Sequence, residues 1–242
     1  VQIISIPLKA CHYRKLQGIM IFLNYQQPLF LKAMRSLNKK NFFVASSVSM
    51  VIAVALIILS FSIGKQAFFL LLNTDAGKFF DQFFRFCTYG GEEWAWIALL
   101  LITLFILKRK DSIVLLIGAV VFSTIIAQGL KNFIFAGEPR PIKAIADTQL
   151  IHTVQGVYVS TINSFPSGHT SSAFSIYLTL CLLINRKWWL PAGLVLAMLV
   201  AYSRIYLAQH FPLDIAGGII NAIISVRLSM LVQEYWWSKR KL

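Results

Sequence analysis

Long apolar runs restrict the fold of this 242-residue chain, because a helix needs about 20 consecutive apolar residues to cross a bilayer. Hydrophobic residues make up 57% of the sequence and charged residues 13%, unlike ordinary soluble domains. Six runs approach the required length: Phe42 to Ile63, Glu93 to Leu107, Ile113 to Phe133, Ser167 to Ile184, Trp188 to Leu207 and Pro212 to Trp236. We therefore predict an all-α bundle of six transmembrane helices. One integral-membrane domain covers residues 41–242, and an N-terminal cytoplasmic segment covers residues 1–40.

The distribution of basic residues predicts how the bundle is oriented. Cytoplasmic segments of membrane proteins carry an excess of Lys and Arg. In a six-span arrangement one side holds Lys9, Arg14, Lys15, Lys32, Arg35, Lys39, Lys40, Lys108, Arg109, Lys110, Arg186, Lys187, Lys239, Arg240 and Lys241. This side is predicted to be cytoplasmic, with both termini inside. Because the net charge of +14 follows the topology instead of forming one basic stripe, no nucleic-acid partner is expected.

The loop after the first run contains phenylalanines at roughly helical spacing among polar residues, from Phe79 to Phe86. This pattern predicts a short helix. Such a helix either lies in the outer interface or packs into the bundle as a re-entrant piece.

Ionisable residues gather at one end of the predicted spans. Lys131 closes the third run, His169 opens the fourth, Arg204 ends the fifth, and His210 with Asp214 opens the sixth. A charged side chain inside a membrane span costs about 2.5 to 3.5 kcal/mol, so such residues point to function. In the predicted topology all five face the outer side.

The stretch "SRIYLAQHFPLD", Ser203 to Asp214, pairs a histidine with a carboxylate four residues later. If the last span begins near Phe211, His210 and Asp214 share a helix face, and Asp214 can fix the tautomer of His210. The other ring nitrogen is then a candidate nucleophile or base. A simple capping pair would also explain the two residues, but Arg204 adds a planar fork suited to phosphate oxygens.

The stretch "NSFPSGHTSSAF", Asn163 to Phe174, starts a helix at the same end. Its free backbone amides favour an anion, Gly168 allows close approach, and Ser167 adds a hydroxyl. A helix cap alone explains Ser167 but not His169, which is placed to protonate a leaving oxygen. Arg140, in "KNFIFAGEPRP", adds a cation in the adjacent loop beside Lys131.

Together these motifs resemble the type 2 phosphatidic acid phosphatase superfamily, which shares its site with vanadium haloperoxidases. The family pattern combines Lys with Arg-Pro, Pro-Ser-Gly-His, and Ser-Arg with a following His and Asp. The second and third parts match unchanged, whereas Lys131 and Arg140-Pro141 are separated by eight residues instead of the usual six. The resemblance covers roughly residues 90–225 and implies a haloperoxidase-like core within the bundle.

The resemblance also implies a metal-independent reaction without cofactors. His210, oriented by Asp214, attacks phosphorus and forms a phosphohistidine, and His169 protonates the departing oxygen and later activates water. The non-bridging oxygens are held by Lys131, Arg140, Arg204, Ser167 and Gly168.

The location of these residues at headgroup depth predicts a lipid substrate. Undecaprenyl diphosphate, phosphatidylglycerophosphate, phosphatidic acid and lipid A all present a suitable phosphate. The outer segment from Ile142 to Ser164 either helps to select a headgroup or is a plain lid. The motifs are typical of bacteria, which places the protein in the inner membrane with a periplasmic site. Two alternatives remain: a lipid phosphotransferase using the same phosphohistidine, and a non-catalytic lipid transporter or binder.

Overall fold

The computed structural model describes residues 36–239 of the chain. The chain divides into two units, Val1–Leu37 and Asn38–Leu242, and the second unit holds all six apolar runs. The predicted cytoplasmic segment, residues 1–40, lies almost wholly outside the described residues. Its placement therefore stays a prediction.

The described part of the chain is helical and contains no strand within residues 36–239, which confirms the all-α prediction. The long helices are α2 (Lys39–Ser62), α6 (Ile113–Gly129), α8 (Gly168–Leu183), α9 (Trp189–Tyr206) and α10 (Pro212–Lys239). The shorter elements are α3 (Lys65–Leu72), α4 (Lys78–Cys87), η1 (Thr88–Gly91), α5 (Glu93–Leu101), η2 (Ile102–Ile106), η3 (Lys110–Ser112), η4 (Leu130–Ile134), α7 (Pro141–Ala144) and η5 (Thr148–Leu150). Each of the six apolar runs therefore contains a helix.

Four helical segments among the described residues are long and apolar enough to cross a membrane: Lys39–Ser62, Lys110–Ile134, Trp189–Tyr206 and Pro212–Lys239. A fifth candidate is the pair Lys78–Gly91 and Glu93–Ile106, which is bent by 63°. The remaining predicted span is α8, whose 16 residues extend over only about 24 Å. The multi-pass membrane character is clear from these segments, and the count of six spans stays a prediction.

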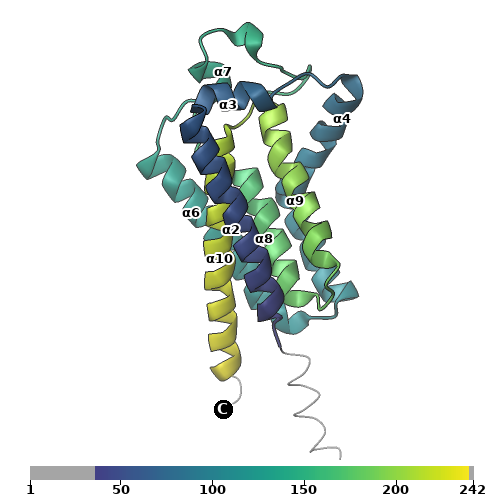
Figure 1. Ribbon diagram of the computed structural model, residues 1–242. Coiled ribbons are helices and arrows are strands. Elements are labelled where there is room, and N and C mark those ends of the chain that lie inside the picture. The colour runs from purple at the N-terminus through teal and green to yellow at the C-terminus, as the bar shows by residue number, and fades with distance from the viewer. Residues whose placement is uncertain (1–35, 240–242) are drawn as a thin grey trace, which may run out of the picture. The chain divides into compact units, whose positions relative to one another are not determined.

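Helix α8 lies at the centre of the bundle, where it packs against α2, α6, α9 and α10 (Figure 1). Most of its residues are buried, including small and polar ones such as Ser171, Ser175 and Thr179. A short helix enclosed by longer ones does not need a lipid-facing apolar surface. This central position explains why α8 can carry several buried polar residues.

Buried hydrogen bonds tie α8 to its neighbours. The Ser171 hydroxyl lies 2.8 Å from the Ser123 hydroxyl of α6, and Asn221 Nδ2 of α10 donates to Ser171 Oγ at 2.7 Å. Asn221 Nδ2 also lies 3.0 Å from the Ser123 carbonyl oxygen. Bonds of this kind between membrane helices contribute about 0.6 kcal/mol each on average. They hold α6, α8 and α10 in one register.

The phenylalanine-rich loop forms helix α4, as its spacing predicted. Phe84 is buried against Tyr202 and Tyr206 of α9, with ring centroids 5.0 and 4.7 Å apart, whereas Phe79 and Phe86 are exposed. The helix thus packs on the bundle by one face and presents aromatic side chains outward by the other. It leads through η1 into α5, across the 63° bend.

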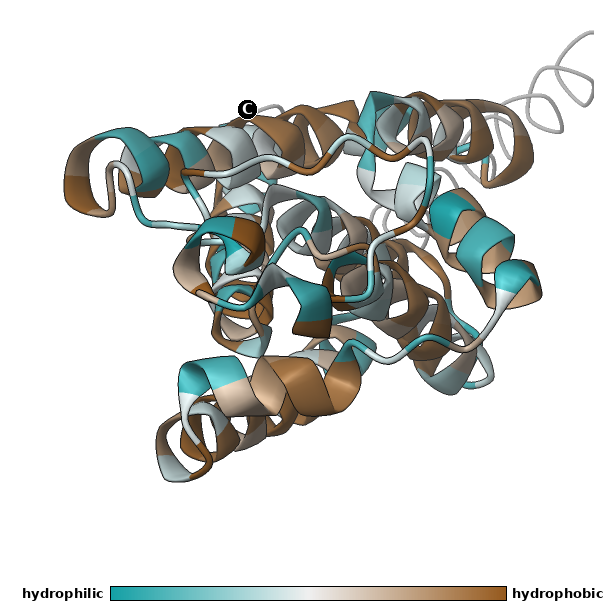
Figure 2. Cartoon of the chain, turned by 90° about the horizontal axis from the view of Figure 1, so that it is seen from above, coloured by the Kyte–Doolittle hydropathy of each residue, from teal (hydrophilic) through white to brown (hydrophobic). Residues whose placement is uncertain are grey.

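The helix ends that carry the ionisable residues lie in the upper part of Figure 1, where α6 and α9 end and α8 and α10 begin. Seen from above in Figure 2, mostly brown helices surround paler loop segments that cross this end. Two backbone contacts join the loops: Ser167 N donates to Asp214 O at 3.0 Å, and His210 N donates to Arg204 O at 3.1 Å. The bundle therefore assembles one polar site from helix ends.

Candidate active site

His210 and Asp214 lie side by side at the start of α10. His210 Nδ1 is 3.4 Å from Asp214 Oδ2, and both side chains are buried. Helix α10 begins at Pro212, so His210 lies just before the helix, and the turn into α10 brings together the two side chains that the sequence pairs. Burial lowers the pKa of His210 well below its ordinary value, and the charges of Arg140, Arg204 and Lys131 act in the same direction. The imidazole is therefore neutral and its Nε2 is free of the carboxylate.

Asp214 is held by two further groups. Ser164 Oγ donates to Asp214 Oδ2 at 2.5 Å, and the Phe211 amide donates to the same oxygen at 2.9 Å. Hydrogen bonds to a carboxylate are stronger than those between neutral groups. The carboxylate is thus fixed beside His210 by partners from two separate segments.

Arg140 is anchored from the loop that precedes α8. Its Nε donates to the Ile162 carbonyl at 2.9 Å, and its Nη1 donates to the Gln209 carbonyl and side-chain oxygen at 3.1 and 3.0 Å. Gln209 in turn donates to the Tyr158 carbonyl at 2.8 Å. The last part of the outer segment therefore supports Arg140, which sets this guanidinium next to His210.

Arg204 and Lys131 complete a group of three cations around His210. Arg204 is buried, donates through Nη1 to Thr88 Oγ1, and keeps a buried Nε for which the described residues provide no acceptor. Lys131 lies in the π-helical turn η4 and interacts electrostatically with Arg140, Arg204 and Asp214. Three cations close to one another repel, so an anion bound among them is strongly stabilised.

Ser167 and Gly168 form the start of α8. Ser167 is the N-cap, and its buried Oγ accepts from Thr170 N at 3.4 Å and from Thr170 Oγ1 at 2.9 Å. These two bonds use the lone pairs of the hydroxyl, whose own hydrogen can still be donated to an anion. No atom lies within 4 Å of a Cβ placed on Gly168, so the space in front of this turn is open.

His169 stands between two cavities, one of about 300 Å³ lined also by Glu92 and Gly168 and one of about 330 Å³ lined also by Arg204 and Gln209. Its Nε2 is 3.8 Å from Glu92 Oε1. The turn η1 packs tightly against His169, because a Cβ on Gly91 would lie 2.7 Å from His169 Cβ. The histidine is thus positioned by Gly91 and lies near the carboxylate of the next residue, Glu92.

The structure therefore gathers all eight predicted side chains or backbone groups at one end of the bundle: Lys131, Arg140, Ser167, Gly168, His169, Arg204, His210 and Asp214. The supporting partners Ser164, Thr88, Gln209 and Glu92 were not predicted. Ser164 and Gln209 adjoin the motifs, but only the folded chain reveals their contacts. Thr88 and Glu92 lie far from the motifs in sequence.

Several known proteins are similar to this chain. The PAP2 superfamily model matches residues 112–238. An undecaprenyl-diphosphatase of Sulfolobus acidocaldarius is 34% identical over 161 residues, which cover 65% of this chain and 73% of that protein. A lipid A 4'-phosphatase of Porphyromonas gingivalis is 30% identical over 166 residues, covering 66% of this chain and 69% of that protein.

Solved structures are also similar. The crystal structure of Aquifex aeolicus LpxE matches with a TM-score of 0.57 and 31% identity, over 67% of this chain and 92% of that one. A PAP2-type phosphatidylglycerolphosphate phosphatase from Bacillus subtilis shares the fold, with a TM-score of 0.56 and 21% identity over 81% of this chain and 96% of that one. This chain therefore belongs to the PAP2 superfamily.

Proposed function

We propose that this membrane protein is a lipid phosphatase that works through a phosphohistidine at His210. The observation that carries the proposal is a buried histidine whose Nδ1 lies 3.4 Å from a buried carboxylate, with the charges of Arg140, Arg204 and Lys131 acting on it. The similar proteins bear the names of phosphatases that act on undecaprenyl diphosphate and lipid A. This combination suits attack on a phosphate group, because the cations stabilise the charge that builds up on phosphorus oxygens.

In the first step, His210 Nε2 attacks phosphorus while the bond to the leaving oxygen breaks. His169 donates a proton to that oxygen, which leaves as the lipid alcohol or the lipid monophosphate. Asp214 accepts from Nδ1–H of His210 and stabilises the positive charge that develops on the ring. The Glu92 carboxylate lies 3.8 Å from His169 Nε2, directly after the turn that packs against this histidine.

In the second step, water attacks phosphorus and gives its proton to His169. The bond between phosphorus and Nε2 breaks, its electron pair returns to the ring, and inorganic phosphate is released. The net reaction is hydrolysis of one phosphate ester or diphosphate bond, and both histidines return to their starting states. Arg140, Arg204 and Lys131 hold the phosphate oxygens in both steps, together with the Ser167 hydroxyl and Gly168 amide.

The proposed location is the inner membrane of a bacterium with the site on the periplasmic side. Basic residues within the described part support this orientation, because eight lie at the end of the bundle opposite the site, whereas the site end holds four besides the site cations Lys131, Arg140 and Arg204. The eight are Lys39, Lys40, Lys108, Arg109, Lys110, Arg186, Lys187 and Lys239. The positive-inside rule assigns that end to the cytoplasm. The proposed substrates are therefore outer-leaflet lipids with an exposed phosphate: undecaprenyl diphosphate, lipid A, phosphatidylglycerophosphate or phosphatidic acid.

The test is phosphate release by detergent-purified protein in the presence of EDTA, with each of these four lipids. Release is expected from the wild type and its loss from His210→Ala. The matched control is His152→Ala, which removes an imidazole that contacts Asp81 at 3.1 Å outside the site and should keep activity.

A rapid-quench experiment with ³²P-labelled lipid tests the intermediate itself. We expect label on the protein that is stable in alkali and lost in acid, as a phosphohistidine is, and no label on His210→Ala. Turnover by a folded His210→Ala protein, or label on a hydroxyl side chain, would contradict the mechanism.

A further inference from the structure

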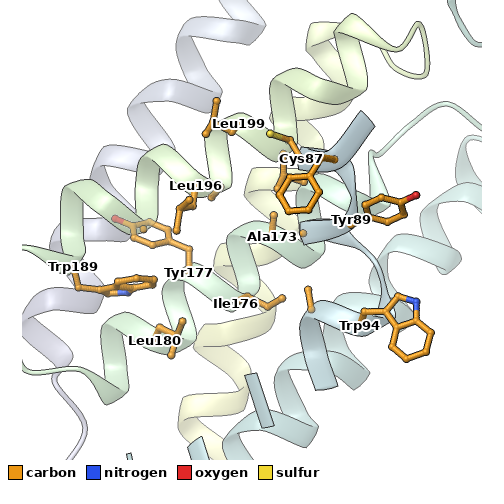
Figure 3. Close-up of a pocket in the computed structure, with 16 residues that line it drawn as sticks. Cys87, Tyr89, Trp94, Ala173, Ile176, Tyr177, Leu180, Trp189, Leu196 and Leu199 are labelled. Atoms are coloured by element: carbon orange, nitrogen blue, oxygen red, sulfur yellow. The ribbon is translucent and has the colours of Figure 1, made fainter. Parts of the chain in front are cut away.

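An apolar groove of about 470 Å³ runs along the bundle next to the site (Figure 3). Its walls come from α8, α9 and the segment from α4 to α5, with Ala173, Ile176 and Leu180 on the α8 side and Leu196 on α9. The aromatic side chains of Tyr177 and Trp189 lie toward one end and those of Tyr89 and Trp94 toward the other (Figure 3). The Tyr177 hydroxyl donates to the Leu190 carbonyl at 3.0 Å, so it does not make the groove polar.

The groove continues the helix faces that carry two site residues. Ala173 follows His169 by four residues on α8, and Val200 precedes Arg204 by four residues on α9. Residues four apart share one face of a helix. The lining along α8 from Ala173 to Leu180 spans about 10 Å and starts about one turn below His169.

The turn η1 forms the boundary between the groove and the site. Tyr89 lines both the groove and the cavity that contains Arg204 and His169. A Cβ on Gly90 would lie 2.8 Å from Val200 in the groove, whereas one on Gly91 would lie 2.7 Å from His169. Two adjacent glycines therefore let this turn lie against the apolar groove and the polar site at once.

The rim of the groove is open between membrane-embedded helices. Leu196 is 56% exposed and Trp94 is 70% exposed. A hydrocarbon chain can thus enter from the side without crossing the polar end, and van der Waals packing against the apolar walls holds it there. Because Tyr89 lines both the groove and the cavity that contains Arg204 and His169, the part of a lipid next to its headgroup would lie at Tyr89 when its phosphate is among the cations.

We propose that this groove binds one hydrocarbon chain of the lipid substrate while its phosphate occupies the site, and that it gives the enzyme its preference for long-chain phosphates. The inference rests on the proposed function, because the chain is that of the lipid being hydrolysed. It assigns chain recognition to α8, α9 and η1, and headgroup recognition to the cations.

The test fills the groove without changing the site. Leu196→Trp adds bulk at a half-exposed wall position, and Ile176→Trp does so from the opposite wall. Val195→Trp is the matched control, because Val195 is 58% exposed on the same helix and does not line the groove. For every lipid of the panel that the wild type hydrolyses, kcat/KM is measured for the three variants. Inhibition by inorganic phosphate is measured beside it, since phosphate probes the charged site alone.

Leu196→Trp and Ile176→Trp should lower kcat/KM for the lipids by about tenfold or more, which corresponds to roughly 1.4 kcal/mol of lost transition-state binding. Their inhibition by phosphate should equal that of Val195→Trp and the wild type. The assignment of the groove would be wrong if kcat/KM for the lipids were the same in all three variants. It would also be wrong if Leu196→Trp and Ile176→Trp lost lipid turnover and phosphate inhibition together. If the wild-type protein releases phosphate from none of the lipids, the proposed function itself is wrong, and the assignment of the groove is wrong with it.

Discussion

Replacing Ser164 by alanine tests whether the hydrogen bond to Asp214 supports both the fold and the chemistry. The bond is short, at 2.5 Å, and both partners are fully buried. A hydrogen bond to a charged group contributes about 1.5 to 3 kcal/mol, so Ser164→Ala should lower the free energy of unfolding by about that amount. Asp214 then keeps only the Phe211 amide and the longer contact to His210.

The same loss should appear in the reaction if the bond holds Asp214 in the position that orients His210. A loss of about 1.5 to 3 kcal/mol of transition-state stabilisation lowers kcat by about 10- to 150-fold, with little change in KM. Unfolding is followed in mixed detergent micelles, and kcat by phosphate release.

The control for this variant is Ser229→Ala, which removes an equally buried hydroxyl that donates to its own helix at Ser225 O, away from the site. It should leave kcat unchanged. The reasoning fails if Ser164→Ala matches the wild type within about 0.5 kcal/mol in stability and also keeps its kcat.

Two further predictions concern the histidines. Gly91→Ala should lower kcat by about 100-fold because its Cβ would lie 2.7 Å from His169 Cβ and must displace it, whereas Gly129→Ala, with open space around it, should keep full activity in the same phosphate-release assay. The pH profile of kcat/KM should lose activity on the acid side only below the ordinary histidine pKa of 6.5, because a lowered pKa keeps His210 unprotonated as the pH falls past that value. An acid limb centred at or above 6.5 would show that His210 is not the neutral nucleophile.

The sequence alone predicted the helices because their signal is local. The predicted span from Phe42 to Ile63 corresponds to helix α2, Lys39–Ser62, and the predicted span from Pro212 to Trp236 corresponds to helix α10, Pro212–Lys239. Twenty apolar residues gain enough free energy from lipid burial to form a helix whatever their neighbours are. The length of α8 and the 63° bend between α4 and α5 were not predictable in this way, because both depend on packing against other helices.

For the site, too, the sequence determined some features and the tertiary structure decided others. The sequence determined which groups are available: two histidines, three cations and Asp214. His210 and Asp214 are only four residues apart, and their contact forms across the turn that leads into α10, because His210 lies just before the helix. Only the tertiary structure decided how they are held, since Ser164 is 50 residues from Asp214, Gln209 is 69 from Arg140 and Thr88 is 116 from Arg204. A buried charge needs partners at hydrogen-bond distance, and those partners come from whichever segments the packed helices bring together. These distant partners therefore cannot be predicted from any local sequence pattern.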